Sequence, residues 1–89
     1  MKGVDDLTFE WDDAKAQSNL AKHGVAFETA AEAFYAADGA HVEDLRSAYG
    51  ETRFNLRATV EGFPLIVTYT VRAGVIRIIS ARKANRKER

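Results

Sequence analysis

Arginines recur in the second half of the chain at spacings that would bring their side chains together. Arg53, Arg57 and Arg72 lie in segments where apolar and polar residues alternate, so each falls on the polar face of an expected strand, as does Thr70. Guanidinium groups bind phosphate through two nitrogens and stay charged at any working pH. Several on one face would form a trough for a phosphate backbone. The other interpretation is a solvated face that only keeps the sheet soluble.

Aromatic and titratable residues near these arginines extend the candidate site. Tyr49 and Tyr69 are close enough in sequence to offer stacking surfaces for bases. Glu51 is the carboxylate on the expected polar face. His23 lies at the end of a predicted helix, and an imidazole exchanges protons near neutral pH. A histidine at that place also complements the helix dipole, so both interpretations of His23 stay open.

Composition excludes several other classes of site. The chain has no cysteine, which rules out disulfides, thiolate metal sites and a cysteine nucleophile. The two histidines and scattered acids lack metal-ligand spacing, and no glycine-rich phosphate loop or hydrolase elbow occurs. We therefore expect no metal and no cofactor. The start lacks a signal peptide and no stretch approaches the roughly 20 apolar residues of a membrane span, which predicts a cytoplasmic protein.

The charge is unevenly distributed, although the chain is neutral overall. Residues 1–50 contain four bases and ten acids, a net charge of −6, and residues 51–89 contain nine bases and three acids, a net charge of +6. The basic half could bind a polyanion, or the two halves could pair in a compact fold. The 89 residues, of which 46% are hydrophobic, predict one small domain over 1–89 in which residues 1–8 are loose.

The first half of the chain is predicted to form a helical hairpin. Asp12 is suited to cap a helix over 13–23, which Gly24 would end in the left-handed conformation. A second helix is expected over 27–34, where apolar residues recur at i, i+3, i+4 and i+7. The segment 9–11 is too short for an independent strand, but it could join a sheet edge.

The second half of the chain is predicted to form strands. They are expected over 40–45, 51–60, 63–72 and 75–80, with hairpin turns at Glu61-Gly62 and Ala73-Gly74. The tail after Ser80 could begin a helix capped by that serine. The order predicts an α+β domain with two N-terminal helices packed on an antiparallel three- to four-stranded sheet and a short C-terminal helix or tail. The face with the arginines would be open.

Four separated motifs are distinctive in combination. They are FEWDDAKAQSNLAKHGVAFETAAEAF (9–34), EDLRSAYGETR (43–53), VTYTVR (67–72) and RIISARKANRKER (77–89). In this order they resemble the BrnT family of toxins from bacterial type II toxin–antitoxin systems, over nearly the whole chain after residue 8. The resemblance implies a RelE-like ribonuclease fold and RNA cleavage that slows translation and growth. It also implies a cognate BrnA-like antitoxin, a DNA-binding protein that neutralises the toxin.

We hypothesise a metal-independent endoribonuclease, for which RNA supplies its own 2′-hydroxyl as the nucleophile. Arginines would stabilise charge on the phosphate, and other groups would move protons. The residues assigned to catalysis are Arg53, Arg72, Glu51, His23, Lys15 and Arg82. Among them, Glu51 or His23 would be the base, and His23 or Lys15 the acid. Further contacts with RNA are expected from Arg57, Arg77, Lys83, Tyr49, Tyr69 and Thr70.

The implied partners are RNA and the antitoxin, with which the toxin could form a heterotetramer, and no membrane is involved. The alternative is a non-catalytic RNA- or protein-binding module of the same fold. A pure binder would need the arginines but no proton-transfer group, so Glu51 and His23 discriminate between the two. At the basic end of the chain, Arg82 and Lys83 are the residues expected to act, because the last strand would leave the sheet there, beside the proposed site.

Overall fold

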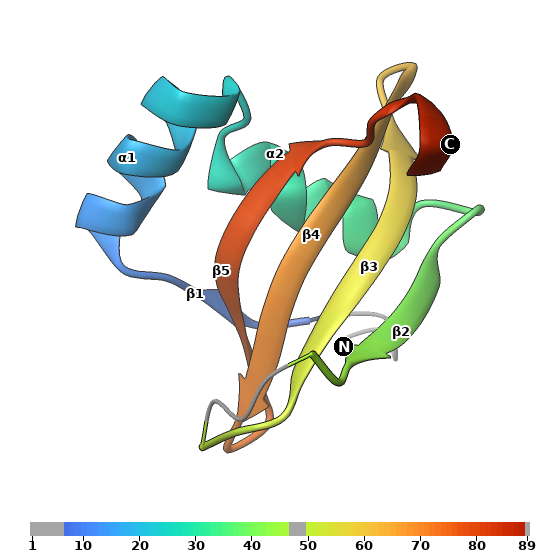
Figure 1. Cartoon of the computed structure of the whole chain (residues 1–89). Coiled ribbons are helices and arrows are strands. Elements are labelled where there is room, and N and C mark those ends of the chain that lie inside the picture. The colour runs from blue at the N-terminus through green and yellow to red at the C-terminus, as the bar shows by residue number, and fades with distance from the viewer. Residues whose placement is uncertain (1–6, 47–49, 89) are drawn as a thin grey trace, which may run out of the picture.

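One helix crosses one face of a five-stranded sheet, the other helix lies beside the sheet, and the opposite face is left open (Figure 1). The structure is a computed structural model that describes residues 7–46 and 50–88. Its elements are β1 (Phe9–Glu10), α1 (Asp13–His23), α2 (Phe27–Glu32), the 3-10 turn η1 (Ala33–Tyr35), β2 (Ala40–Asp44), β3 (Arg53–Val60), β4 (Phe63–Arg72), β5 (Val75–Lys83) and the 3-10 turn η2 (Arg86–Glu88). No helix in this described part is long and apolar enough to cross a membrane.

The helical hairpin forms where its local signals predict it. The side chain of Asp12 accepts a hydrogen bond from the backbone N–H of Lys15 (3.0 Å) at the start of α1. Gly24 ends that helix with φ of 71°, a conformation that costs glycine little. The helix α2 and η1 continue the predicted second helix, with Phe27 and Ala30 fully buried. The prediction of two N-terminal helices is confirmed.

The sheet has more strands than predicted, and it is mixed. Its order is β1-β5-β4-β3-β2, and β1 pairs with β5 in parallel through Phe9 and Ile76. The prediction of three or four antiparallel strands is therefore wrong at this edge. A two-residue strand has no sequence period of its own, so its pairing depends on tertiary packing. Here the Phe9 ring packs edge-on against Phe34, with ring centroids 5.2 Å apart.

The N-terminal segment is attached to this body from Leu7 onwards. The backbone N–H of Leu7 donates to the hydroxyl of Tyr35 (3.2 Å), and the carbonyl of Thr8 accepts from the N–H of Ile76 (2.9 Å). Leu7 and Thr8 are therefore bonded to the domain, although they were expected to be loose. The rest of that expectation concerns residues 1–6, which lie outside the described residues.

The central strands follow the predicted alternation. Leu56, Ala58 and Val60 of β3 are buried against the helices. On the open face, the hydroxyl of Thr68 in β4 donates to the side-chain oxygen of its β3 partner, Asn55 (2.7 Å). The predicted hairpin turns are also present, because Glu61-Gly62 and Ala73-Gly74 all have positive φ, as type I′ turns require.

The last strand differs from its prediction in length and in register. The strand β5 continues to Lys83, so Ser80 is a strand residue paired with Thr68 and does not cap a helix. Pairing with β4 outweighs the local signal for a cap. A bulge at Thr68/Tyr69 shifts the register, so that Ile79 has no partner in β4. After the bulge, each residue of β5 therefore faces the opposite side of the sheet from the one that a regular strand would give it.

One buried polar side chain attaches α1 to the sheet. Asn19 donates from Nδ2 to the carbonyls of Val25 (2.9 Å) and Ala81 (2.8 Å), and its Oδ1 accepts from the N–H of Ala81 (3.1 Å). The strand β1 pairs with only two residues of β5. At Ala81, the side chain of Asn19 makes the backbone hydrogen bonds that a neighbouring strand would otherwise make. The remaining core is apolar and lies between α2 and the sheet.

Candidate functional site

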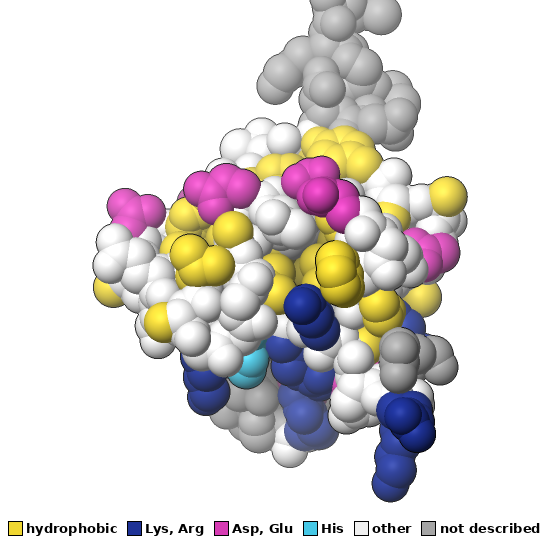
Figure 2. Space-filling view, turned by 90° about the horizontal axis from the view of Figure 1, so that it is seen from above, with side chains coloured by type: hydrophobic (Ala, Val, Ile, Leu, Met, Phe, Trp, Pro, Cys, Tyr) yellow, Lys and Arg dark blue, Asp and Glu magenta, His cyan; other side chains and the backbone are white. Residues whose placement is uncertain are grey.

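A hollow on the open face of the sheet gathers three arginines. Its volume is about 510 Å³, and Ala40, Val42 and Ile66 provide its apolar lining. Figure 2 shows that Lys and Arg side chains gather on one side of the molecule, away from most of the Asp and Glu side chains. We call the hollow that the three arginines line the basic hollow. Its polar lining residues are Arg46, Asn55, Arg57, Thr68, Ser80, Arg82 and Glu88.

Strand register places these side chains side by side. Ile66 of β4 is paired with Arg57 on β3 and with Arg82 on β5, so an arginine stands on each side of it. Thr68 is flanked in the same way by Asn55 and by Ser80. The basic hollow is therefore built from two adjacent rows that run across three strands, and each row has polar groups at both ends.

The third arginine is held by a buried carboxylate at the end of β2. Asp44, whose side chain is 2% exposed, accepts from the backbone N–H of Arg46 (3.1 Å) and from its Nε and Nη2 (both 2.9 Å). These hydrogen bonds from Arg46 lower the pKa of Asp44 to about 2. The guanidinium is 76% exposed beside the basic hollow, so Asp44 fixes its place without covering it.

We expect acid to weaken this contact. Because the pKa of folded Asp44, about 2, lies below the ordinary 3.8, the contact contributes fully to stability above about pH 4 and is lost as the pH falls towards 2. Asp44→Asn should therefore lose less free energy of unfolding than wild type between about pH 5 and about pH 3 in urea denaturation. Glu43→Gln, at an exposed neighbouring position, is the matched control and should behave as wild type. Equal losses in Asp44→Asn and wild type would contradict the expectation.

Arg82 is paired with a carboxylate from the C-terminal turn. Its Nη1 donates to Oε1 of Glu88 (2.7 Å) and its Nη2 donates to Oε2 (2.8 Å). These bonds, together with one from the backbone N–H of Asn85, hold the pKa of Glu88 at about 2. Glu88 is therefore a negative charge inside an otherwise basic hollow.

Arg53 and Arg72, which the sequence assigned to catalysis, lie outside the basic hollow. Glu51 accepts from Nε (3.0 Å) and Nη2 (2.7 Å) of Arg72, and its other oxygen is 3.7 Å from Nε of Arg53. We call these three residues the Glu51 cluster. The hydrogen bonds from Arg72, and then the charges of both arginines, lower the pKa of Glu51. A carboxylate held in this way is a weak proton acceptor.

His23 and Lys15 lie together in a second hollow beside α1. This hollow, of about 210 Å³, is also lined by Ser18, Asn19, Lys22, Ile79 and Ser80. We call it the helix groove. Ser80 lines both the helix groove and the basic hollow, so the two adjoin at this residue of β5. The helix groove, which His23 and Lys15 line, therefore borders the basic hollow on the β5 side.

Three of the expected RNA contacts are engaged elsewhere. Thr70 is 2% exposed, and its hydroxyl donates to the carbonyl of Thr52 (2.6 Å). Tyr69 is buried on the helix-covered face, where its hydroxyl is hydrogen-bonded to Nδ1 of His41 (2.7 Å). Arg77 is on the open face but donates to Glu10 of β1 (3.0 Å). Thr70 and Tyr69 are too buried to touch RNA in this conformation, and Tyr49 lies outside the described residues.

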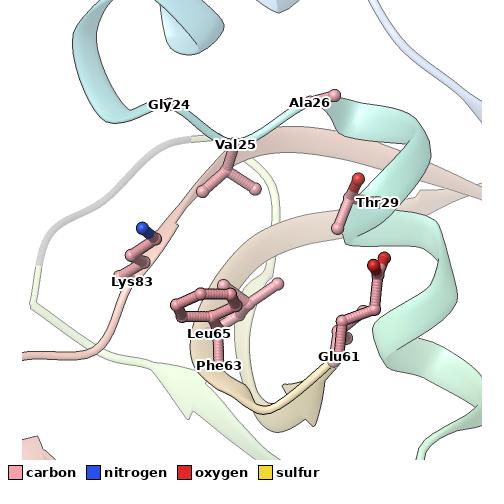
Figure 3. Close-up of a pocket in the computed structure, with 9 residues that line it drawn as sticks. Gly24, Val25, Ala26, Thr29, Glu61, Phe63, Leu65 and Lys83 are labelled. Atoms are coloured by element: carbon pink, nitrogen blue, oxygen red, sulfur yellow. The ribbon is translucent and has the colours of Figure 1, made fainter.

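Lys83 points away from its neighbour Arg82. Consecutive strand residues alternate between faces, and Lys83 lies over the ring of Phe63, with Nζ 4.5 Å from the ring centroid. Figure 3 shows Lys83 and Phe63 in a separate pocket of about 210 Å³, together with Val25 and Thr29 from the helical hairpin. Arg82 and Lys83, both expected to act where the last strand leaves the sheet, therefore line different pockets on opposite faces of β5.

Sequence reasoning did not assign five polar residues of the basic hollow to the site. Asn55, Thr68 and Ser80 carried no distinctive signal, because a single amide or hydroxyl on a strand is common. Arg46 belongs to the motif EDLRSAYGETR but was not assigned to the site. Glu88 was taken as part of a basic tail, although Asn85, three residues before it, is a residue that favours a capped turn. Among the described residues, no group of three or more His, Cys, Asp or Glu gathers where it could hold a metal ion.

A family profile covers most of the chain. The profile of a family described as ribonuclease toxin, BrnT, of type II toxin–antitoxin system matches residues 11–88. This range includes every residue that lines the basic hollow and the helix groove. No curated protein matches the chain. As its motifs predicted, the chain belongs to the BrnT family, the ribonuclease toxins of type II toxin–antitoxin systems.

Proposed function

We propose that the basic hollow binds the RNA phosphate at which this ribonuclease cuts, and that cleavage needs no metal ion. The observation that carries the proposal is the row in which Arg57 and Arg82 flank Ile66 across three strands. Guanidinium groups match phosphate geometry and can stabilise the charge that grows on the phosphate oxygens. Arg46, fixed by Asp44, adds a third positive charge beside the same hollow.

The reaction would use the nucleophile that RNA carries. The 2′-hydroxyl attacks the adjacent phosphorus while a base takes its proton, the bond between phosphorus and the 5′-oxygen breaks, and an acid protonates that oxygen. The helix groove that His23 lines adjoins the basic hollow at Ser80, which supports a role for this histidine in the reaction. We assign His23 to proton transfer, and Lys15 to the charge of a neighbouring phosphate in the same groove.

The Glu51 cluster supports a role at the edge of this site. Glu51 is paired with both arginines of the cluster, and the low pKa of that carboxylate makes it a poor base. The cluster ties Glu51, two residues before β3, to Arg72 at the end of β4. We assign Arg53 and Arg72 to holding these strand ends in place, and rank both behind Arg57 and Arg82 for phosphate binding.

The toxin's protein partner follows from the kind of system. A type II toxin–antitoxin family implies an antitoxin. We propose a BrnA-like, DNA-binding antitoxin that forms a heterotetramer with the toxin in the cytoplasm, and whose loss allows RNA cleavage to slow translation and growth. One helix across one face of a twisted sheet and a second helix beside the sheet, with a basic open face, support a RelE-like fold for this activity.

Cleavage of a fluorescent single-stranded RNA in excess EDTA is the direct test. Wild type should cut equally fast with and without EDTA, because arginines supply the positive charge. Arg57→Ala should slow cutting about tenfold, less than the loss of an enclosed oxyanion donor, because Arg57 is exposed. Arg72→Ala is the comparison in the Glu51 cluster and should slow cutting less than Arg57→Ala does.

Two results would count against the proposal. If Arg72→Ala abolished cutting while Arg57→Ala did not, the reaction would take place at the Glu51 cluster. If EDTA stopped cutting and Mg²⁺ restored it, a metal ion would be required. Urea denaturation of each variant checks that a slower rate does not reflect a smaller folded fraction.

A further inference from the structure

Glu88 occupies the place in the basic hollow that an RNA phosphate would need. Its two carboxylate oxygens accept from the two terminal nitrogens of Arg82, at 2.7 and 2.8 Å. A phosphate that binds an arginine through two nitrogens uses this same arrangement. The nearby charge of Arg57 also favours the ionised form of Glu88. The Glu88 carboxylate therefore binds Arg82 in the two-nitrogen geometry that a phosphate of the proposed RNA substrate would use.

The chain holds this carboxylate in position by a short ordered path. After β5, the N–H of Ala84 donates to the carbonyl of Pro64 on β4 (2.8 Å). The side-chain oxygen of Asn85 then accepts from the N–H groups of Lys87 (3.0 Å) and Glu88 (3.1 Å), which closes η2. The N–H of Asn85 in turn donates to Oε1 of Glu88 (2.9 Å). Because Glu88 is only six positions after Arg82, a carboxylate that releases the guanidinium stays tethered near it.

We propose that Glu88 is an internal anion that competes with RNA phosphate for Arg82. The inference rests on the proposed function of the basic hollow. In the free toxin Arg82 is neutralised, and a phosphate must displace Glu88 before it can bind both guanidinium nitrogens. Only the fraction of molecules with Glu88 released binds RNA fully, which raises the apparent dissociation constant by the inverse of that fraction. The ion pair is partly exposed, with side chains 40% and 27% accessible, so displacement is feasible.

Glu88→Gln tests this competition, because it removes the charge and nearly keeps the shape. The probe is a 2′-O-methyl RNA oligonucleotide, which has no 2′-hydroxyl to react, and binding is measured by fluorescence anisotropy at fixed salt. Glu88→Gln should bind this RNA about two- to tenfold more tightly than wild type. Glu32→Gln, at an exposed position on α2, makes the same change in net charge and should bind within about twofold of wild type.

Arg82→Ala separates failure of this inference from failure of the proposed function. If Arg82→Ala does not weaken RNA binding, the basic hollow is not the phosphate site. If Arg82→Ala weakens binding but Glu88→Gln binds no more tightly than wild type, the hollow binds RNA and the competition is overturned. If Glu32→Gln tightens binding as much as Glu88→Gln does, net charge explains the gain and the competition is likewise overturned. In the Arg82→Ala background, the gain from Glu88→Gln should shrink.

Discussion

Replacing Arg82 with alanine is expected to reduce kcat/KM for RNA cleavage about 10²- to 10³-fold, the loss typical of one donor to a developing oxyanion. Both terminal nitrogens of Arg82 meet the carboxylate of Glu88, so an anion inside the basic hollow aligns this guanidinium. It is also less exposed than Arg46, with 40% of the side chain accessible against 76%. A less solvated charge interacts more strongly with a phosphate. Single-turnover cleavage of a labelled RNA measures the effect.

Two variants show whether the loss arises at the phosphate. Arg82→Lys keeps the charge but loses the two-nitrogen fork, so it should recover only part of the rate. Arg77→Ala removes another ion-paired arginine from the open face of β5, outside the basic hollow, and should cost less than about fivefold. If Arg82→Ala cleaves RNA at a rate within about threefold of wild type, the assignment of Arg82 to the reacting phosphate is contradicted. Full rescue by lysine would reduce the role of Arg82 to a general positive charge.

Replacing Asn19 with alanine is expected to lower the free energy of unfolding by about 3 kcal/mol. The change removes three hydrogen bonds and leaves the carbonyls of Val25 and Ala81, and the N–H of Ala81, without their partner. Each buried polar group left unsatisfied costs about 1–3 kcal/mol, and relaxation or water entry recovers part of the sum. Because Asn19 also lines the helix groove, the same change should loosen α1, and with it His23 and Lys15, from β5.

Urea denaturation followed by tryptophan fluorescence measures this loss. Trp11 is the only tryptophan, and its ring packs edge-on against buried Phe27 (centroids 5.9 Å apart), so its emission should report on the folded core. Gln17→Ala, at an exposed position on the same helix, is the matched control and should change stability by less than about 0.5 kcal/mol. A cost below about 1 kcal/mol for Asn19→Ala would show that water replaces the side chain, and that α1 is held by apolar packing alone.

Elements with local signals could be predicted from the sequence. The cap at Asp12 and the left-handed Gly24 set the ends of α1, because both act on backbone groups within one turn. The turns at 61–62 and 73–74 set both ends of β4, whose observed bounds match the prediction. The end of β5 could not be predicted, since the pairing of Ser80 with Thr68 involves residues twelve positions apart.

The sequence predicted which residue types form the candidate site more successfully than it predicted which positions those residues occupy. Arg57 and Arg82 were both named, but so were Arg53 and Arg72, because Arg53, Arg57 and Arg72 alternate with apolar residues in the same way. Nothing local reveals that Glu51 pairs with both Arg53 and Arg72. That pairing depends on how the start of β3 lies against the end of β4.

The sequence by itself determined the family, the helical hairpin and the presence of an arginine-rich open face. Only the tertiary structure decided which arginines share a hollow. Arg77 and Arg82 are five residues apart, so a regular strand would turn them to opposite faces. The bulge in β5 adds one unpaired residue between them and brings both to the open face, while Lys83 turns to the other. A bulge forms where two strands meet, and neither strand's own residue pattern contains it.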